Sequence, residues 1–404
     1  MKKYLLILLF TGFLFELVAE DNMYANPVIS RSMPDPTIIR AEDGYFYLYA
    51  TEDIRNTPIY RSSNLVDWTF VGTVFTNETR PSFEPNGGLW APDINYINEK
   101  YVLYYSMSVW GGEQTCGIGV ATSPNPFNRF SDKGKLFRSN EIGVQNSIDP
   151  FYIEDGGKKY LFWGSFRGIY YVELSDDGLR LKNPNDPQPQ QIAGTAFEGT
   201  YIHKRGDYYY LFVSRGSCCE GLNSTYNLVV GRSESLTGPY KNKQGNLMLA
   251  NNYTNVINSS IRFKGNGHCS EIVQDDAGND WMFLHGWDAE NEKNGRVLLL
   301  TQIKWDSRDW PYVDNYALPE IATKPVFGTN TINEISDMKL QLQKDGSMLR
   351  FKSHLSSDVK IFTSDGRLIT KFENSTNFQI HLTSGIYLVQ INTKTDSILK
   401  KVFI

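Results

Sequence analysis

The sequence predicts an all-β fold, namely a five-bladed β-propeller followed by a small C-terminal β-sandwich-like domain. Aromatic-rich segments recur at spacings of roughly 50 to 70 residues, which is typical of one β-sheet per repeat. Gly, Pro, Asn and Asp turns separate them, and no stretch has the 3.6-residue periodicity of a long helix. The segments are residues 45–51, 101–107, 159–166, 208–215 and 281–288.

Each repeat also closes with a related outer segment. Ser62, Ser123, Ser175 and Ser233 hold the same place in four of these segments. Short strands alternating with turns in this way indicate antiparallel sheets. We therefore predict that residues 26–330 form the propeller domain.

The first 25 residues have the pattern of a signal peptide. Lys2 and Lys3 precede the apolar stretch 4–15, and the stretch is too short for a typical membrane span, which is the rival interpretation. Cleavage near Ala19 or Ala25 fits this pattern. No later apolar run is long enough to span a bilayer, so we expect a secreted or cell-surface protein with no integral membrane segment.

Residues 331–404 differ in composition, because tryptophan is absent from them. Two stretches, 359–372 and 385–393, have the pattern of short sandwich strands. The segment resembles the C-terminal sorting domain of type IX secretion cargo, through SGIYLVQI and the terminal KKVFI. The resemblance implies contact with a secretion machinery, and an accessory sandwich that stays attached is the alternative.

Charge and cysteine content exclude several classes of protein. The formal net charge is −5, so no basic face indicates a nucleic-acid partner. Four cysteines are too few for a disulfide scaffold in 404 residues, and the absence of a CxxC pair argues against structural zinc. Adjacent Cys218 and Cys219 could form a vicinal disulfide or remain two thiols.

A polar residue stands in the turn before each aromatic segment. In a propeller the innermost strand of each blade begins at the central channel, so these residues should converge on one pit. They are Asp35 in PDPT, Asp93 in APDI, Asp149 in SIDP, Glu198 in FEGT and His268 in GHCS.

Carboxyl groups gathered in this way indicate glycoside hydrolysis. An ionised carboxylate activates water while a protonated one donates its proton to the leaving group, and inverting enzymes hold the two roughly 6.5 to 9.5 Å apart. A third carboxylate nearby raises the pKa of the acid. Asp35, Asp149 and Glu198 are the candidates. Asp before Pro is also a common turn former, and a salt bridge to Arg205 or Arg215 would equally explain a buried Glu198.

These motifs resemble those of glycoside hydrolase family 43. The matching elements are PDPT at Asp35, LWAPDI at 89–94, NSIDP at 146–150, FEG at Glu198 and GNGHCS around His268. The resemblance implies a five-bladed propeller in which Asp35 is the general base, Asp149 the pKa modulator and Glu198 the general acid. Gly199 departs from the pattern, since many relatives carry Ala there.

Residues 215–240, with their CC-G-NSTY element, resemble the arabinanase branch of that family. This resemblance implies an arabinan endo-1,5-α-L-arabinosidase, with arabinan or an arabinoxylan-type polysaccharide as partner. An exo-acting α-L-arabinofuranosidase or β-xylosidase is the alternative, because loop lengths do not separate endo from exo action. A sugar-binding propeller without catalysis is a further alternative.

Other residues are candidates for contacts with the sugar. Trp90 could stack on a sugar ring or belong to the core, and Gly111 would let the backbone approach the sugar. Further candidates are Asn146, Ser147, Ile148, Ser165, Phe166 and Arg167. Hydrolysis needs no redox or nucleotide cofactor. The family resemblance implies a structural calcium in the channel, reached by His268 through water, although calcium prefers oxygen ligands.

Overall fold

The computed structural model describes residues 22–127, 130–327, 332–335, 340–345, 347–364, 366–392 and 397–404. The described part of the chain is all-β, as predicted, and its one α-helix is the single turn α1 (Ser139–Ile142). Most of the expected signal peptide lies outside these residues. No described helix has the length and apolar character needed to cross a membrane.

Residues 29–312 form five antiparallel sheets in which strands that follow one another in the chain pair with each other. The first sheet contains β3 (Thr37–Arg40), β4 (Phe46–Tyr49), β5 (Pro58–Ser62) and β6 (Thr69–Thr73). The second contains β7 (Gly88–Ile97), β8 (Lys100–Ser108), β9 (Gly117–Ser123) and β10 (Ser131–Arg138). The third contains β11 (Phe151–Asp155), β12 (Lys158–Trp163), β13 (Ile169–Glu173) and β14 (Gln190–Ala193).

The fourth sheet contains β15 (Glu198–Arg205), β16 (Tyr208–Arg215), β17 (Asn227–Ser233) and β18 (Thr254–Ile257). The fifth contains β19 (Phe263–Gly267), β20 (Val273–Gln274), β21 (Asp280–Asp288), β22 (Arg296–Trp305) and β23 (Pro311–Tyr312). Short 3₁₀ turns in the connections are η2 (Gly221–Asn223), η3 (Met248–Ala250), η4 (Glu292–Asn294) and η5 (Asp314–Tyr316).

The two ends of this region meet. Strand β2 (Ile29–Ser32) pairs with β22, so the N-terminal segment completes the last sheet, and β1 (Met23–Ala25) pairs with β24 (Ile321–Thr323). Tyr24 is buried and its hydroxyl donates to the carbonyl of Leu300. Signal cleavage near residue 19 would keep β1, whereas cleavage near residue 25 would remove it.

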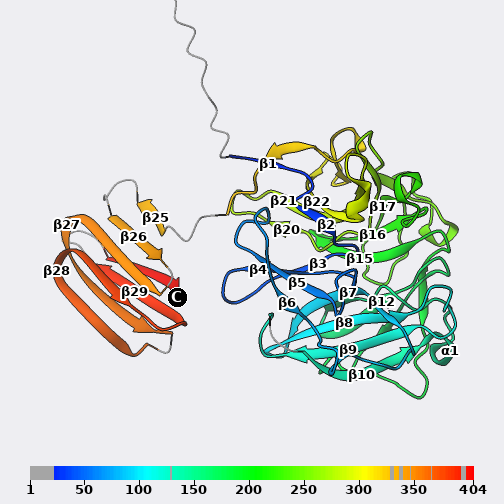
Figure 1. Cartoon of the computed structure of the whole chain (residues 1–404), viewed down its shortest axis with the longest axis horizontal. Helices are drawn as coiled ribbons and strands as arrows, with labels where there is room; N and C mark the ends of the chain where they lie inside the picture. Colours follow the sequence, from blue (N-terminus) through cyan, green and yellow to red (C-terminus); the bar gives the residue numbers. More distant parts are fainter. Residues whose placement is uncertain are drawn as a thin grey trace, which may run out of the picture.

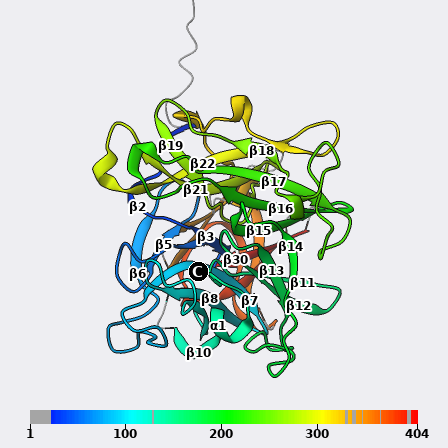
Figure 2. The same ribbon diagram turned by 90° about the vertical axis from the view of Figure 1, so that its right-hand side faces the viewer.

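The core lies between neighbouring sheets, because side chains alternate between the two faces of a strand. From β4, Tyr47 and Tyr49 pack with Leu103 of the second sheet, while Phe46 and Leu48 pack on the other side with residues of the fifth. The first sheet is therefore packed against both the second and the last. Figures 1 and 2 show the sheets following one another around a common centre, which is a propeller-type fold.

The C-terminal residues form a separate antiparallel sheet. Its long strand β27 (Met348–Thr363) pairs with three others, β26 (Leu340–Asp345), β28 (Leu368–His381) and β29 (Ile386–Asn392). The outer strands are β25 (Ile332–Ile335) and β30 (Ser397–Phe403). Phe351, Val359, Ile361 and Val389 belong to its own core. The predicted stretches 359–372 and 385–393 thus contribute to β27, β28 and β29.

Candidate active site

One backbone position recurs in the five sheets, and three of the five residues at this position line the site. The residues there share a positive φ, which places them in the left-handed region. In three sheets the preceding residue pairs with Ser106, Ser214 or His285 of the second strand, so the positions are equivalent. The residues and their φ values are Asp35 (54°), Ala91 (40°), Asp149 (62°), Gly199 (62°) and His268 (48°).

A repeated hydrogen bond holds this position. In four junctions its N–H donates to a side chain of the preceding sheet: Ala91 to Thr51 at 2.7 Å, Asp149 to Ser106 at 2.9 Å, His268 to Ser214 at 2.8 Å, and Asp35 to Nδ1 of His285 at 3.0 Å. The junction between the third and fourth sheets differs. The third sheet has Gly164 just after β12, and a glycine has no side chain that could accept the N–H of Gly199. There the Gly199 N–H donates to Oδ2 of Asp149 at 3.1 Å, which fixes this carboxyl beside Glu198.

This register corrects one prediction. Asp93 was expected in the pit, but Ala91 occupies the equivalent position in the second sheet. Asp93 lies two residues further along β7, where it is buried and accepts the N–H of Tyr152 at 2.8 Å. In the fourth sheet the recurring position is held by Gly199, and Glu198 comes one residue before it. Its side chain still reaches the cavity.

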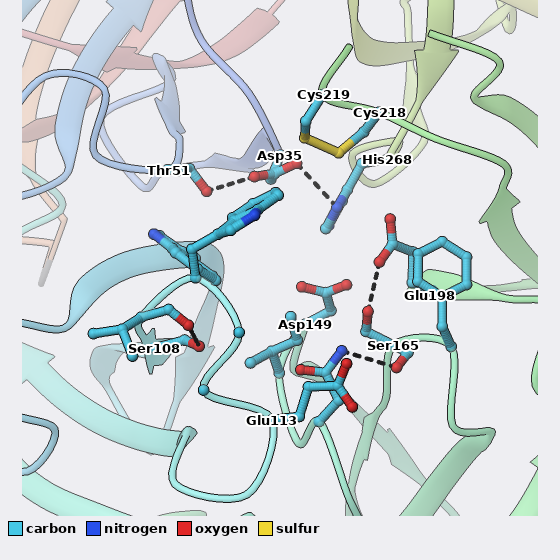
Figure 3. Close-up of a pocket in the computed structure, with 18 of the residues that line it drawn as sticks. Asp35, Thr51, Ser108, Glu113, Asp149, Ser165, Glu198, Cys218, Cys219 and His268 are labelled. Atoms are coloured by element: carbon cyan, nitrogen blue, oxygen red, sulfur yellow. Dashed lines mark hydrogen bonds and ion pairs between the residues drawn. A yellow bond between two sulfur atoms is a disulfide. The ribbon is translucent and has the colours of Figure 1, made fainter.

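The three predicted acids line one cavity of about 570 Å³ (Figure 3). Trp90, Gly111, Asn146, Ile148, Ser165, Phe166 and His268 also line it. Trp90 is therefore a cavity residue, and it meets the highly exposed Trp110 edge to face, with ring centroids 6.1 Å apart. An aromatic surface of this kind can pack on the C–H face of a sugar.

Two predicted contacts fall outside the lining. Ser147 is fully buried, donates to the carbonyl of Val144 and accepts the indole N–H of Trp163 at 2.9 Å. It supports the loop beneath Asp149 rather than facing the cavity. Arg167 points to Glu113, 2.8 Å from its Oε2, and it is Glu113 that lines the cavity.

Asp35 is held in its ionised form. Thr51 donates to Oδ2 at 2.6 Å, while His268 and Arg296 lie 3.2 and 3.5 Å from Oδ1. Burial alone would raise the pKa of Asp35, but the charges of Arg296 and His268 outweigh it and hold the pKa well below its usual value. A carboxylate that is ionised at neutral pH can accept a proton from the attacking water.

The other two carboxyls are shifted the opposite way. Burial raises the pKa of Glu198, although Ser165 and Tyr226 donate hydrogen bonds to it, with Ser165 2.6 Å from Oε2. Burial also raises the pKa of Asp149 to about 7; the charge of His268 lowers it, whereas the charges of Glu198 and Asp35 raise it. The site thus combines one acid that stays ionised with two that retain protons more readily, the arrangement that acid–base hydrolysis needs.

The two histidines beside Asp35 differ in charge. Burial lowers the pKa of His268, but the negative charges of Asp35, Asp149 and Glu198 have the larger effect and raise the pKa to about 9. His268 is therefore an imidazolium at neutral pH. Burial lowers the pKa of His285 to about 4. Neutral His285 accepts the Asp35 N–H through Nδ1, so its hydrogen is on Nε2, which has no partner among the described residues.

The described side chains do not fit a direct calcium cage. No group of three or more His, Cys, Asp and Glu residues in the described ranges could hold a metal ion. His268, as an imidazolium paired with Asp35, has no lone pair to offer, and calcium takes six to eight oxygen ligands. The water-mediated calcium contact stays a prediction.

Sequence reasoning missed several residues of the site. Thr51, Trp110, Glu113, Tyr226 and Arg296 line the cavity, and so do Cys218 and Cys219, which form a disulfide. The salt bridges offered as an alternative for Glu198 are wrong, because Arg205 pairs with Asp280 and Arg215 donates to Tyr253. Thr51 had a detectable signal, since Ser106 and Ser214 occupy the same place in other aromatic segments.

A propeller-type fold with three buried carboxyls in one sugar-sized cavity defines a glycoside hydrolase. Residues 24–311 match the model of glycosyl hydrolases family 43, and the chain belongs to this family. Residues 343–404 match the model of the secretion system C-terminal sorting domain, which confirms the second resemblance.

Relatives and solved structures agree with this assignment. The chain is 34% identical over 313 residues to an extracellular exo-α-(1→5)-L-arabinofuranosidase of Cellvibrio japonicus, covering 70% of this chain and 87% of that protein. It is 34% identical over 294 residues to an extracellular endo-α-(1→5)-L-arabinanase of Bacillus subtilis, covering 69% and 86%. The solved α-L-arabinanase of Cellvibrio cellulosa with arabinohexaose has a TM-score of 0.64 at 33% identity, covering 70% and 96%.

Proposed function

We propose that the chain is an exported, inverting glycoside hydrolase that cleaves α-1,5-linked L-arabinofuranosyl bonds within arabinan, and that its five sheets are the blades of a five-bladed propeller. The observation that carries the proposal is the opposite shift of the carboxyl pKa values in one cavity, low for Asp35 and raised for Asp149 and Glu198. The relatives named as an exo-α-(1→5)-L-arabinofuranosidase and an endo-α-(1→5)-L-arabinanase are each 34% identical to it over the aligned residues.

Each carboxyl has its own role in the proposed reaction. Asp35 removes a proton from the attacking water, because Arg296 and His268 keep it ionised. Glu198 gives its proton to the departing sugar oxygen. We assign Asp149 to positioning rather than proton donation because its Oδ2 accepts the Gly199 N–H, which ties it to the backbone beside Glu198.

Replacement of the acids tests the proposal. Asp35→Asn and Glu198→Gln should each lower kcat on linear arabinan by at least about a thousandfold, since each removes a proton-transfer group. Thermal unfolding should show that both variants remain folded. With the wild-type enzyme, NMR of the anomeric proton should show that the first product formed has the inverted anomeric configuration. Wild-type rates in either variant would remove the assignment.

Exo action is the second candidate, because the Cellvibrio japonicus relative is named as an exo enzyme. A product profile on linear arabinan separates the two: oligosaccharides of several lengths support endo action, and a single short product supports exo action. The same assay with arabinoxylan and aryl β-xylosides tests the xylosidase alternative. Saturable binding without hydrolysis would favour the non-catalytic alternative.

Export is part of the proposal. The N-terminal pattern and the C-terminal sorting domain together support secretion or cell-surface display through the type IX route. Mass spectrometry of the exported protein would identify both of its ends. Retention of residues 1–19 would contradict the signal-peptide prediction.

A further inference from the structure

The Cys218–Cys219 disulfide is not used by the proposed proton transfers, yet it faces the catalytic cavity. The two residues follow β16 and line the same cavity as the three acids. Cys218 is half-buried and Cys219 is exposed. Figure 3 shows the disulfide beside Asp35 and His268, on the side of the cavity where the general base lies.

We propose that this disulfide is a substrate-binding surface that packs against the arabinofuranosyl unit bound beside Asp35. The inference rests on the proposed function for the identity of the sugar. Two linked sulfurs present a polarizable, apolar surface without a hydrogen-bond donor. Sugar sites combine such apolar surfaces with a few placed polar groups, and here the polar groups are the acids, His268 and Arg296.

The disulfide is held in place from both sides. The indole N–H of Trp287 donates to the carbonyl of Cys218 at 2.9 Å. Further along the loop, Glu220 N–H donates to Ser224 at 3.0 Å and Leu222 N–H donates to Glu292 at 3.1 Å. The cross-link also removes side-chain rotation, so little conformational freedom is lost when a sugar packs on it. These contacts make a rigid wall, whereas two free thiols would make an adjustable one.

Binding measurements test this role separately from catalysis. In an E198Q background, calorimetry with arabinohexaose should give a Kd that C218A/C219A raises on the order of five- to tenfold. Reductant should raise the Kd of the E198Q protein similarly and leave that of the triple variant unchanged. The buried thiols Cys116 and Cys269 are present in both proteins, so they do not cause the difference.

A matched control separates the sulfur surface from loop order. Glu292→Ala removes the acceptor of the Leu222 N–H and loosens the same loop without touching the disulfide. Its Kd should stay near that of E198Q. The inference would be overturned if the Kd for arabinohexaose were equal with and without the disulfide. It would also be overturned if E292A weakened binding as much as C218A/C219A does, or if E198Q did not bind arabinohexaose. A wild-type protein that binds but does not hydrolyse would contradict only the proposed function.

Discussion

The hydroxyl oxygen of Thr51 lies 2.6 Å from Oδ2 of Asp35 and also accepts the N–H of Ala91 at 2.7 Å. One small side chain therefore joins the first two sheets and the proposed general base. Because Ala91 supplies a donor to the hydroxyl oxygen, the hydroxyl hydrogen is directed to the carboxylate. A hydrogen bond to the charged form stabilises it and favours the ionised state of Asp35.

Thr51→Val should therefore destabilise the ionised form of Asp35 while conserving the volume of the side chain. Loss of a hydrogen bond to a charged group costs about 1.5 to 3 kcal/mol, so kcat/KM at pH values on the acid limb should fall roughly 10- to 100-fold. The acid limb of the kcat/KM profile should move to higher pH, since the pKa of Asp35 rises. Thr51→Ser keeps the hydroxyl and should behave nearly as wild type. Equal rates for the Val and Ser variants would contradict this role.

Ser165 controls the other limb of the pH profile. Its hydroxyl donates to Oε2 of Glu198 and lowers the pKa of that carboxyl, which burial raises overall. Ser165→Ala should raise the pKa of Glu198 further, so the protonated acid should persist to higher pH and the alkaline limb should shift upward. Ser108→Ala is the control, because Ser108 lines the cavity but donates to the carbonyl of Val109. A downward shift in S165A would show that Glu198 is not the titrating acid.

His268 should act on both limbs at once. As an imidazolium with a pKa of about 9, it lowers the pKa values of Asp35, Asp149 and Glu198 by its charge. His268→Gln should therefore move the acid and alkaline limbs upward together. His203→Gln serves as the control, since burial lowers the pKa of His203 to about 4 and it lies against Tyr201, outside the cavity. Limbs that move in opposite directions would contradict an electrostatic role.

The repeats made the all-β fold and the gathering of Asp35, Asp149 and His268 predictable, because equivalent positions in a repeat share one place in space. The register within each repeat was not predictable. Asp93 lies beyond the pit because Ala91 holds the equivalent position in the second sheet, and Asp93 follows it by two residues along β7. A polar residue near the right place in the sequence can thus serve a different part of the fold.

The remaining site residues come from outside the leading turns. Arg296 begins β22 in a segment without an obvious motif. Tyr226, just before β17, is the last residue of the NSTY element, which carried no predicted role in the site. Their approach to Asp35 and Glu198 follows from packing between sheets far apart in the sequence. Ser147 shows the converse, since its neighbours in the motif face the cavity while its own side chain points into the core.

Asp93 provides a prediction on stability. Burial, and then the charge of Glu271, raise the pKa of Asp93 well above its usual value, and burial also raises the pKa of Glu271. Glu271 in turn accepts the hydroxyl of Thr37 at 2.8 Å and the N–H of Ile38 at 2.7 Å. The two carboxyls thus link the first, second and fifth sheets at a place separate from the cavity lining.

A raised pKa in the folded protein makes stability fall as pH rises. The unfolded chain ionises Asp93 above about pH 4 while the native state keeps the proton, so stability present below that pH is lost toward the folded pKa. Asp93→Asn cannot ionise, and its amide oxygen can still accept the Tyr152 N–H. Its unfolding free energy should fall less between about pH 4 and pH 7 than that of wild type. Asp176→Asn, at an exposed site, is the control for denaturant unfolding across this range. Identical pH slopes for wild type and D93N would mean that Asp93 is ionised in the native protein.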